Sequence, residues 1–322
     1  DQRVVLSASI GIKVGDASCT ASSMMRDADL AMYDAKSTGK ARWAMYEPAL
    51  RAAAMHRLEL ENDLRQALDK RQFRLLYQPV VELSSNAIVG FEALLRWDHP
   101  TLGVILPEAF IPIAEANGTI VEIGRWVLEE ACRTGAEWRS SMPANALSMA
   151  VNLSVRQIAT PEIVADVARA VASWGFPAES LVLEMTESVL VKDPDTAALR
   201  LQELRALGVR LAIDDFGTGY SSLSYLRQFP IDILKIDKSF VQTITDQSPD
   251  PAIVRGLLDL AKTLSIQTVA EGIEIDVQLE SLREQHCDYG QGFLFARPLE
   301  RTAAAALAAR HQARVPALEG SR

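Results

Sequence analysis

Residues 181–217, LVLEMTESVLVKDPDTAALRLQELRALGVRLAIDDFG, contain the pattern that decides the fold of this chain. Residues 181–187 and 210–215 are short apolar runs typical of buried strands. Residues 195–207 between them have the length and composition of a helix. A strand, a helical crossover and a second strand form the unit from which parallel α/β folds are built.

The same alternation extends on both sides of this stretch, from about residue 73 onward. It predicts further strands at 74–83, 88–97, 147–154, 233–237, 267–271 and 290–295, and further helical segments at 107–139, 161–174 and 251–264. Eight strands with helical crossovers in about 240 residues favour a TIM-type (β/α)8 barrel. A doubly wound open sheet is the alternative, but it would usually need a glycine-rich phosphate turn after an early strand, and none is present.

The first 70 residues have a different organisation. Residues 4–12 predict a strand and residues 22–36 a helix. Residues 49–70 predict a second helix, because leucines recur at every fourth position, and we interpret it as a connector. We therefore expect four parts, which are a small piece at 1–48, the connector at 49–70, the barrel at 71–310 and a tail at 311–322.

Composition narrows the classes of function. The net charge of −9 would repel a phosphate-rich ligand unless metal ions or a local basic spot bind it. The sequence has no Lys/Arg run of useful length, which argues against a binder of nucleic-acid polymers. Cys19, Cys132 and Cys287 form no CxxC pair, which fits a reducing compartment such as the cytoplasm. No apolar stretch reaches the ~18 residues of a membrane span. The opening residues do not resemble a signal peptide but the middle of a domain, so an anchor on a longer parent would lie outside this chain.

The most informative feature is a set of polar residues within or at the ends of the apolar strands. One buried carboxylate could belong to a structural ion pair, but five carboxylates and one amide on these strands need another explanation. In a barrel the carboxyl ends of the strands converge on one face, so these oxygen ligands would meet there and bind Mg²⁺, Mn²⁺ or Ca²⁺. The set comprises Glu92, Asn152, Glu184, Asp214, Asp215 and Glu271, joined by Lys235 and Gln291.

The adjacent Asp214 and Asp215 indicate a site for two metal ions. Strand neighbours normally point to opposite faces, but at a strand end followed by Phe216-Gly217 both can turn toward the mouth. A two-metal site clamps the attacking and leaving oxygens of a phosphoryl displacement. Lys235 would orient the attacking hydroxide or neutralise developing charge, with a salt bridge to a site acid as the alternative.

Missing motifs argue against two other kinds of enzyme. Residues 215–217 spell the DFG of protein kinases, but the sequence has neither an H-R-D loop nor a glycine-rich phosphate loop. The four histidines are isolated, with no H-E-x-x-H pair, which argues against a histidine metallohydrolase.

Over residues 70–300 these strings resemble the EAL phosphodiesterase family, whose naming motif stands here at 92–94. The resemblance implies that Lys235, Glu271 and Glu92 are catalytic, with Lys235 acting on the attacking water. Gln78, Arg96 and Gln291 would bind substrate or fix the water and metal network, and Glu187 would anchor the loop at 215–222. It implies one ion held by Glu92, Asn152, Glu184 and Asp214, and a second held by Asp214, Asp215 and Glu271.

The resemblance also implies the activity. The protein would use two Mg²⁺ or Mn²⁺ ions, with Ca²⁺ inhibitory, to hydrolyse cyclic di-GMP to linear pGpG, and would form a homodimer through the barrel. A catalytically inactive cyclic di-GMP receptor is the alternative, and an unrelated metal-dependent barrel enzyme is a more distant one. Residues 1–48 resemble the end of a GGDEF diguanylate cyclase domain, although the GGDEF string is absent and Lys40 replaces the usual arginine.

Overall fold

The computed structural model describes residues 7–16, 19–37, 39–142, 147–189, 193–217, 229–245 and 251–312. The chain divides into two compact units, residues 1–70 and 71–322. In the described part, no helix combines the length and the apolar character needed to cross a membrane.

The first unit is a small α/β arrangement. Strand β1 (Ile10–Ile12) pairs in parallel with β2 (Trp43–Met45), and α1 (Ala21–Ser37) connects them. Helix α2 (Pro48–Ala67) follows, and Pro48 suits its first turn because proline lacks the N–H that the turn leaves unpaired. The predicted strand at 4–12 is shorter than expected within the described residues, and residues 1–6 lie outside them.

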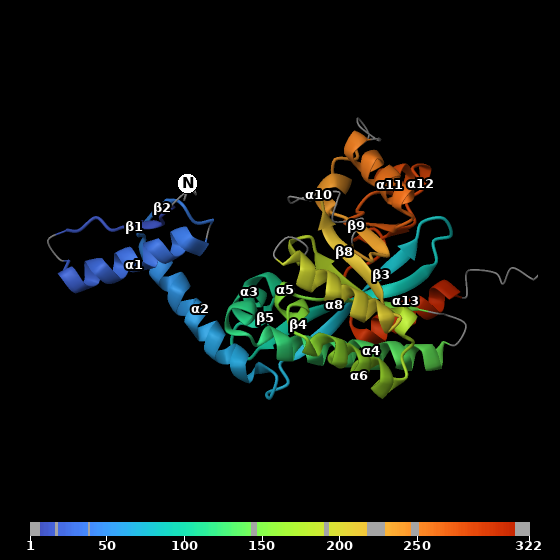
Figure 1. Ribbon diagram of the computed structural model, residues 1–322, viewed down its shortest axis with the longest axis horizontal. Helices are drawn as coiled ribbons and strands as arrows, with labels where there is room; N and C mark the ends of the chain where they lie inside the picture. The colour runs from blue at the N-terminus through green and yellow to red at the C-terminus, as the bar shows by residue number, and fades with distance from the viewer. Residues whose placement is uncertain are drawn as a thin grey trace, which may run out of the picture. The chain divides into compact units, whose positions relative to one another are not determined.

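The second unit is a closed barrel of eight strands with one extra edge strand (Figure 1). The TIM-type barrel is thereby confirmed. Its strands run around the barrel in the order β3, β11, β10, β9, β8, β7, β6 and β4, and β4 pairs back with β3 to close it. The strands are β3 (Phe73–Glu82), β4 (Ile88–His99), β6 (Ser148–Asn152), β7 (Leu181–Thr186), β8 (Arg210–Phe216), β9 (Ile233–Ile236), β10 (Gln267–Ala270) and β11 (Tyr289–Gly290), with β5 (Gly103–Ile105) at the edge of β4.

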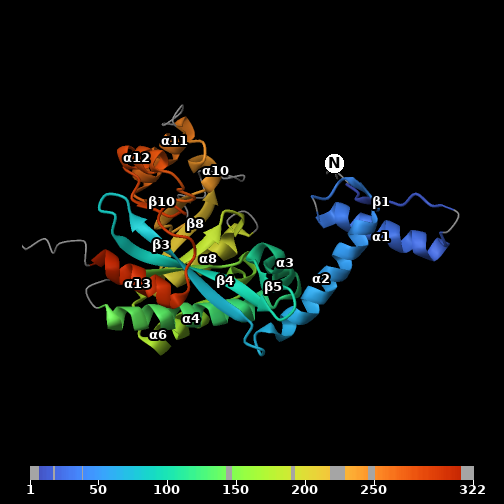
Figure 2. The same ribbon diagram turned by 180° about the vertical axis from the view of Figure 1, so that it is seen from behind.

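Helices cover the outside of the barrel, and α4 and α6 lie side by side there in both views (Figures 1 and 2). The helical elements are α3 (Pro107–Asn117), α4 (Ile120–Ser141), α5 (Val155–Ile158), α6 (Glu162–Trp174), the 3-10 turn η1 (Ala178–Ser180), α8 (Pro194–Ala206), α10 (Lys238–Val241), α11 (Ala252–Leu264), α12 (Asp276–Glu284) and α13 (Arg301–Gln312).

Three details differ from the sequence prediction. Strand β3 is antiparallel to both of its neighbours and joins β4 directly as a hairpin, so the first crossover helix of an ideal (β/α)8 barrel is absent. The helical segment expected at 107–139 is two helices, because Gly118 adopts φ 91° and ends α3. The strand expected at 290–295 stops at Gly290, because the chain then turns, with the Phe295 N–H donating to the Gly292 carbonyl at 3.2 Å.

Candidate active site at the carboxyl end of the barrel

The side chains that point into the barrel change from apolar to polar or charged between two successive layers, which are two residues apart along each strand. Five parallel strands each contribute one small or branched apolar residue to a common interior cluster, namely Ala150, Val182, Ala212, Ile233 and Val269. Residues i and i+2 of a strand share a face, so the residue two positions later also points inward, one layer nearer the carboxyl end. Those residues are Asn152, Glu184, Asp214, Lys235 and Glu271.

The other three strands complete this polar layer around Glu92. Gln78 on β3 lies opposite Glu92 on β4 in the strand register. The Gln291 side-chain amide, directly after β11, donates to Glu92 Oε2 at 2.7 Å and to Gln78 Oε1 at 2.9 Å. Asn152 Nδ2 donates to Glu92 Oε1 at 2.7 Å. Both oxygens of the Glu92 carboxylate are therefore fixed by amide donors from separate strands.

Lys235 stands at the centre of the layer, with a side chain only 1% exposed. Its Nζ lies 2.7 Å from Glu184 Oε2 and 2.7 Å from Glu271 Oε1. It also lies 3.3 Å from Asp214 Oδ1 and 3.7 Å from Glu92 Oε2. One buried ammonium thus touches four carboxylates from four strands, and without it their charges would repel each other in a medium that screens poorly.

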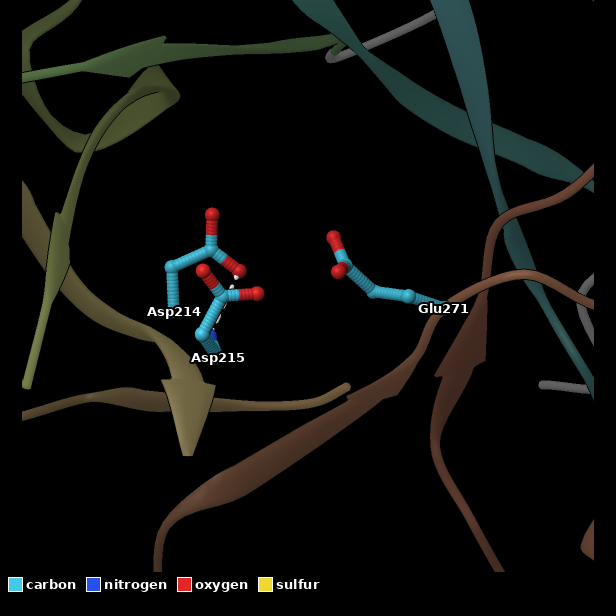
Figure 3. A group of neighbouring side chains, drawn as sticks. All are labelled: Asp214, Asp215 and Glu271. Atoms are coloured by element: carbon cyan, nitrogen blue, oxygen red, sulfur yellow. Dashed lines mark hydrogen bonds between the residues drawn. The ribbon is translucent and has the colours of Figure 1, made fainter. Parts of the chain in front are cut away.

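An irregularity in β8 turns both aspartates toward the site. The pairing of β8 with β9 shifts between Ile213 and Phe216, and Asp215 adopts a left-handed backbone with φ 53°. Such a bulge re-aims a side chain that would otherwise point outward. Oxygens of Asp214, Asp215 and Glu271 consequently lie within 4.8 Å of one another, as metal ligands do (Figure 3).

The pKa values reflect burial first and then the crowding of like charges. Burial raises the pKa of Glu184 well above its usual value and that of Glu271 to about 7, although Lys235 opposes both shifts. Burial also favours the neutral form of Lys235 and of Glu92, but charged partners outweigh it. Four carboxylates hold the pKa of Lys235 well above its usual value, and Lys235 with the amides of Gln291 and Asn152 lowers the pKa of Glu92. The layer therefore favours additional positive charge.

A cleft of about 820 Å³ opens onto this layer, within the range of small-molecule sites. Its lining includes Gln78, Glu92, Arg96, Asn152, Asp214, Glu271 and Gln291. Arg96 is the cationic member of this group, and burial lowers the pKa of its guanidinium. Glu184 and Lys235 lie beneath, almost completely buried.

Glu187 lies apart from this network. It is 7% exposed, and neither carboxylate oxygen has a hydrogen-bond partner among the described residues. The loop that we expect it to anchor begins at Asp215, but residues 218–222 lie outside the described part. The role of Glu187 therefore stays a prediction.

Asp237 is a site residue that the sequence analysis did not propose. It follows β9 and is buried, and after burial and Asp214 it also raises the pKa of Asp215. Its carboxylate also accepts from the Ser239 N–H at 2.9 Å and so begins α10. The available signal was its spacing, because Asp237 lies two residues after Lys235 on the same side of the strand.

Comparison with known proteins shows the family. The EAL domain profile matches residues 61–298. The bifunctional diguanylate cyclase/cyclic di-GMP phosphodiesterase MucR of Pseudomonas aeruginosa is 44% identical over 298 residues, and the cyclic di-GMP phosphodiesterase NbdA of the same organism is 40% identical over 301. Each alignment covers 92% of this chain but only 43% of MucR and 38% of NbdA, so the chain spans less than half the length of these relatives.

A solved structure of the P. aeruginosa MucR phosphodiesterase in complex with c-di-GMP has the same fold. It is 44% identical and superposes with a TM-score of 0.72, covering 76% of this chain and 99% of that one. The family profile and this solved structure agree with the barrel fold. The chain therefore belongs to the EAL domain family.

Proposed function

We propose that this protein is a metal-dependent phosphodiesterase that hydrolyses cyclic di-GMP to linear 5′-pGpG. The observation that carries the proposal is the buried Lys235 ammonium among four carboxylates, beside the Asp214, Asp215 and Glu271 group. The named activities of MucR and NbdA and the c-di-GMP complex of the MucR domain support the choice of substrate.

The donor set fits divalent cations. Five carboxylates against one ammonium leave a formal charge of −4 when all are ionised, which two divalent ions balance. We assign one ion to Glu92, Asn152, Glu184 and Asp214, and the other to Asp214, Asp215 and Glu271. Oxygen ligands favour Mg²⁺ or Mn²⁺. When bound, the ions supply Lewis-acid stabilisation of charge on the phosphate and lower the pKa of a water molecule.

The protein residues position the reacting groups. Lys235 orients the attacking water and stabilises the charge that develops on the phosphate. Gln291 and Asn152 hold the two oxygens of Glu92 in place, so this carboxylate keeps one orientation. Arg96 contacts a phosphate of the substrate from the cleft wall, and Gln78 lies in the nucleotide pocket. Gln78 is itself held by its Nε2 donating to the Ala296 carbonyl at 3.2 Å.

The reaction is a simple displacement at phosphorus. A new bond forms between the water oxygen and one phosphorus atom, and the bond from that phosphorus to the ribose 3′ oxygen breaks. The leaving oxygen takes a proton, and the product carries one 5′-phosphate and one free 3′-hydroxyl. The second phosphodiester stays intact, which defines the product as pGpG.

Two further proposals concern parts around the site. Glu187 anchors the loop at 215–222, and the barrel forms a homodimer through which this loop influences turnover. Residues 1–48 are the end of a GGDEF domain. Two observations support this assignment. These residues have the order strand, helix, strand. The MucR alignment covers 92% of the chain, so it reaches into the first 60 residues.

Incubation with cyclic di-GMP and Mg²⁺, followed by chromatography, tests the function. We expect pGpG to accumulate with Mg²⁺ or Mn²⁺ and to stop with excess chelator or with Ca²⁺, whose looser coordination misplaces the water. Undiminished hydrolysis in chelator would overturn the two-metal assignment. Tight binding of cyclic di-GMP with no product under any metal would identify a receptor module instead.

A further inference from the structure

Gln157 on α5 is a buried amide in the lining of the cleft. The residue is only 3% exposed. Its Oε1 accepts from the Ser154 N–H at 3.1 Å, and its own backbone N–H donates to Ser154 Oγ at 3.2 Å. These reciprocal bonds form a capping box at the start of α5. The side chain is therefore held in one orientation, with its oxygen already used.

The amide nitrogen of the same side chain has no such partner. Nε2 of Gln157 donates to none of the described residues, and it is not among the fully enclosed atoms that lack a partner, so it keeps contact with the cleft. Beside it lies α4, where a Cβ added to Gly124 would be 1.9 Å from Nε2. The glycine leaves room for the amide, and both residues line the cleft. The result is a hydrogen-bond donor that is fixed in place and open toward the cleft.

The surroundings of this donor suit a flat heterocycle. Ile123 and Val127 lie on either side of Gly124 along α4, and both line the cleft. Apolar walls with a few placed polar groups are typical of small-molecule sites. Asn152, which we assign to a metal ion, lies five residues before Gln157 on the segment that leads into α5. A base that reaches Gln157 therefore belongs to a nucleotide whose phosphate lies at the polar layer.

Guanine and adenine differ at the edge that such a donor meets. Guanine presents two adjacent acceptors, O6 and N7, whereas adenine presents N7 beside the N6 amino group, which is itself a donor. A glutamine with a free oxygen pairs with adenine through both amide atoms, but Oε1 of Gln157 is held by Ser154. We propose that Gln157 Nε2 donates to O6 or N7 of one guanine base and thereby selects guanine over adenine, an inference that rests on the proposed phosphodiesterase function.

The experiment compares cyclic di-GMP with cyclic di-AMP, which differ only in their bases. We expect wild-type protein to bind cyclic di-GMP about 10-fold to 100-fold more tightly, measured by calorimetry in Ca²⁺, which is typical of a well-placed contact to a base edge. Gln157→Glu keeps an oxygen for the Ser154 N–H but replaces the donor by an acceptor, so it should lower this ratio about 10-fold. The added negative charge weakens both ligands alike, which is why the ratio is the readout.

Two further variants separate base recognition from general damage. Gly124→Ala leaves Gln157 in the chain but places a methyl group where Nε2 lies, so it should lower the ratio as Gln157→Glu does. Gln242→Glu, at an exposed glutamine elsewhere in the lining of the cleft, adds the same charge and should keep the wild-type ratio.

Three results overturn the assignment of Gln157. They are a wild-type protein without preference between the two ligands, a ratio within about twofold of wild type in Gln157→Glu, and an equal loss in Gln242→Glu. Wild-type protein that prefers cyclic di-GMP in Ca²⁺ but releases no pGpG with Mg²⁺ or Mn²⁺ overturns the proposed function instead.

Discussion

The two units of this chain differ in how completely they bury their apolar side chains. In the first unit, Gly11 faces α1, so its neighbour Ile10 points to the opposite side of the small sheet. Ile10 is 55% exposed there, and Trp43 and Met45 on the paired strand are also exposed. The barrel instead closes its sheet and buries residues such as Phe91 and Trp97 completely.

The difference shows what closure of a sheet makes possible. Two strands and two helices cannot cover both faces of their small sheet, and Ile10, Trp43 and Met45 stay exposed on the face opposite α1. A closed barrel has no free edge among its eight strands and encloses an interior. The layer between the barrel and its outer helices, where Phe91 packs on Trp138 and Trp97 on Phe110, buries enough apolar surface to tolerate Lys235 and its carboxylates. That charged group would destabilise a smaller core.

The largest expected effect is the loss of turnover when Lys235 is removed from the charged layer. Lys235→Ala should lower turnover of cyclic di-GMP by about 10²–10⁴, because it removes the group that orients the nucleophile and stabilises charge. Affinity in Ca²⁺ should change far less, because the metal ligands and Arg96 remain. Lys36→Ala, at an exposed lysine of the first unit, is the control and should keep wild-type kinetics. Equal loss of binding and turnover would make Lys235 a substrate-binding residue.

A second prediction compares packing in the two units through a pair of helical leucines. Leu128 on α4 is 0% exposed, so Leu128→Ala should lower the free energy of unfolding of the barrel by about 2–5 kcal/mol. Leu58 on α2 is 55% exposed, and Leu58→Ala should cost about 0.5 kcal/mol or less. Urea unfolding followed by tryptophan fluorescence measures both. Similar losses in the two variants would contradict the comparison.

The third prediction concerns the buried Glu187. If it positions the loop at 215–222, Glu187→Ala should reduce turnover about 10-fold to 100-fold, the usual result of misplacing catalytic groups. Circular dichroism should stay unchanged, and sedimentation should show a weaker dimer. Glu284→Ala on the exposed surface of α12 provides the control. Wild-type kinetics with unchanged sedimentation would remove Glu187 from the site.

The fourth prediction concerns the reactivity of the three cysteines with a thiol reagent, which requires no mutation. Burial raises the pKa of the Cys132 and Cys287 thiols, both in the barrel, to about 12. At pH 8 these thiols stay protonated and should not react with a thiol reagent, because the thiolate is the nucleophile. Cys19 in the first unit is half-buried, so we expect one reactive thiol in the native protein and three in urea. Three fast-reacting thiols without denaturant would show that the barrel opens readily.

Much of the site was predictable because its signals are local. Apolar strands interrupted by Asn152, Glu184, Asp214 and Glu271 indicated where each strand meets the barrel mouth. The structure brings these residues together around Lys235, and it includes the salt bridges that were the alternative for that lysine. Asp237 was missed because a single acid after a strand end is also typical of a helix cap, which it forms as well.

The sequence by itself determined the alternation of strands and helices and the inward polar positions, because period and spacing are properties of neighbouring residues. Only the tertiary structure decided that β3 runs antiparallel, that β8 bulges at its aspartates, and that Lys235 reaches four carboxylates. These features depend on register between strands far apart in the chain. Register is selected by closure of the whole barrel, since a shift of one residue would turn every inward side chain outward.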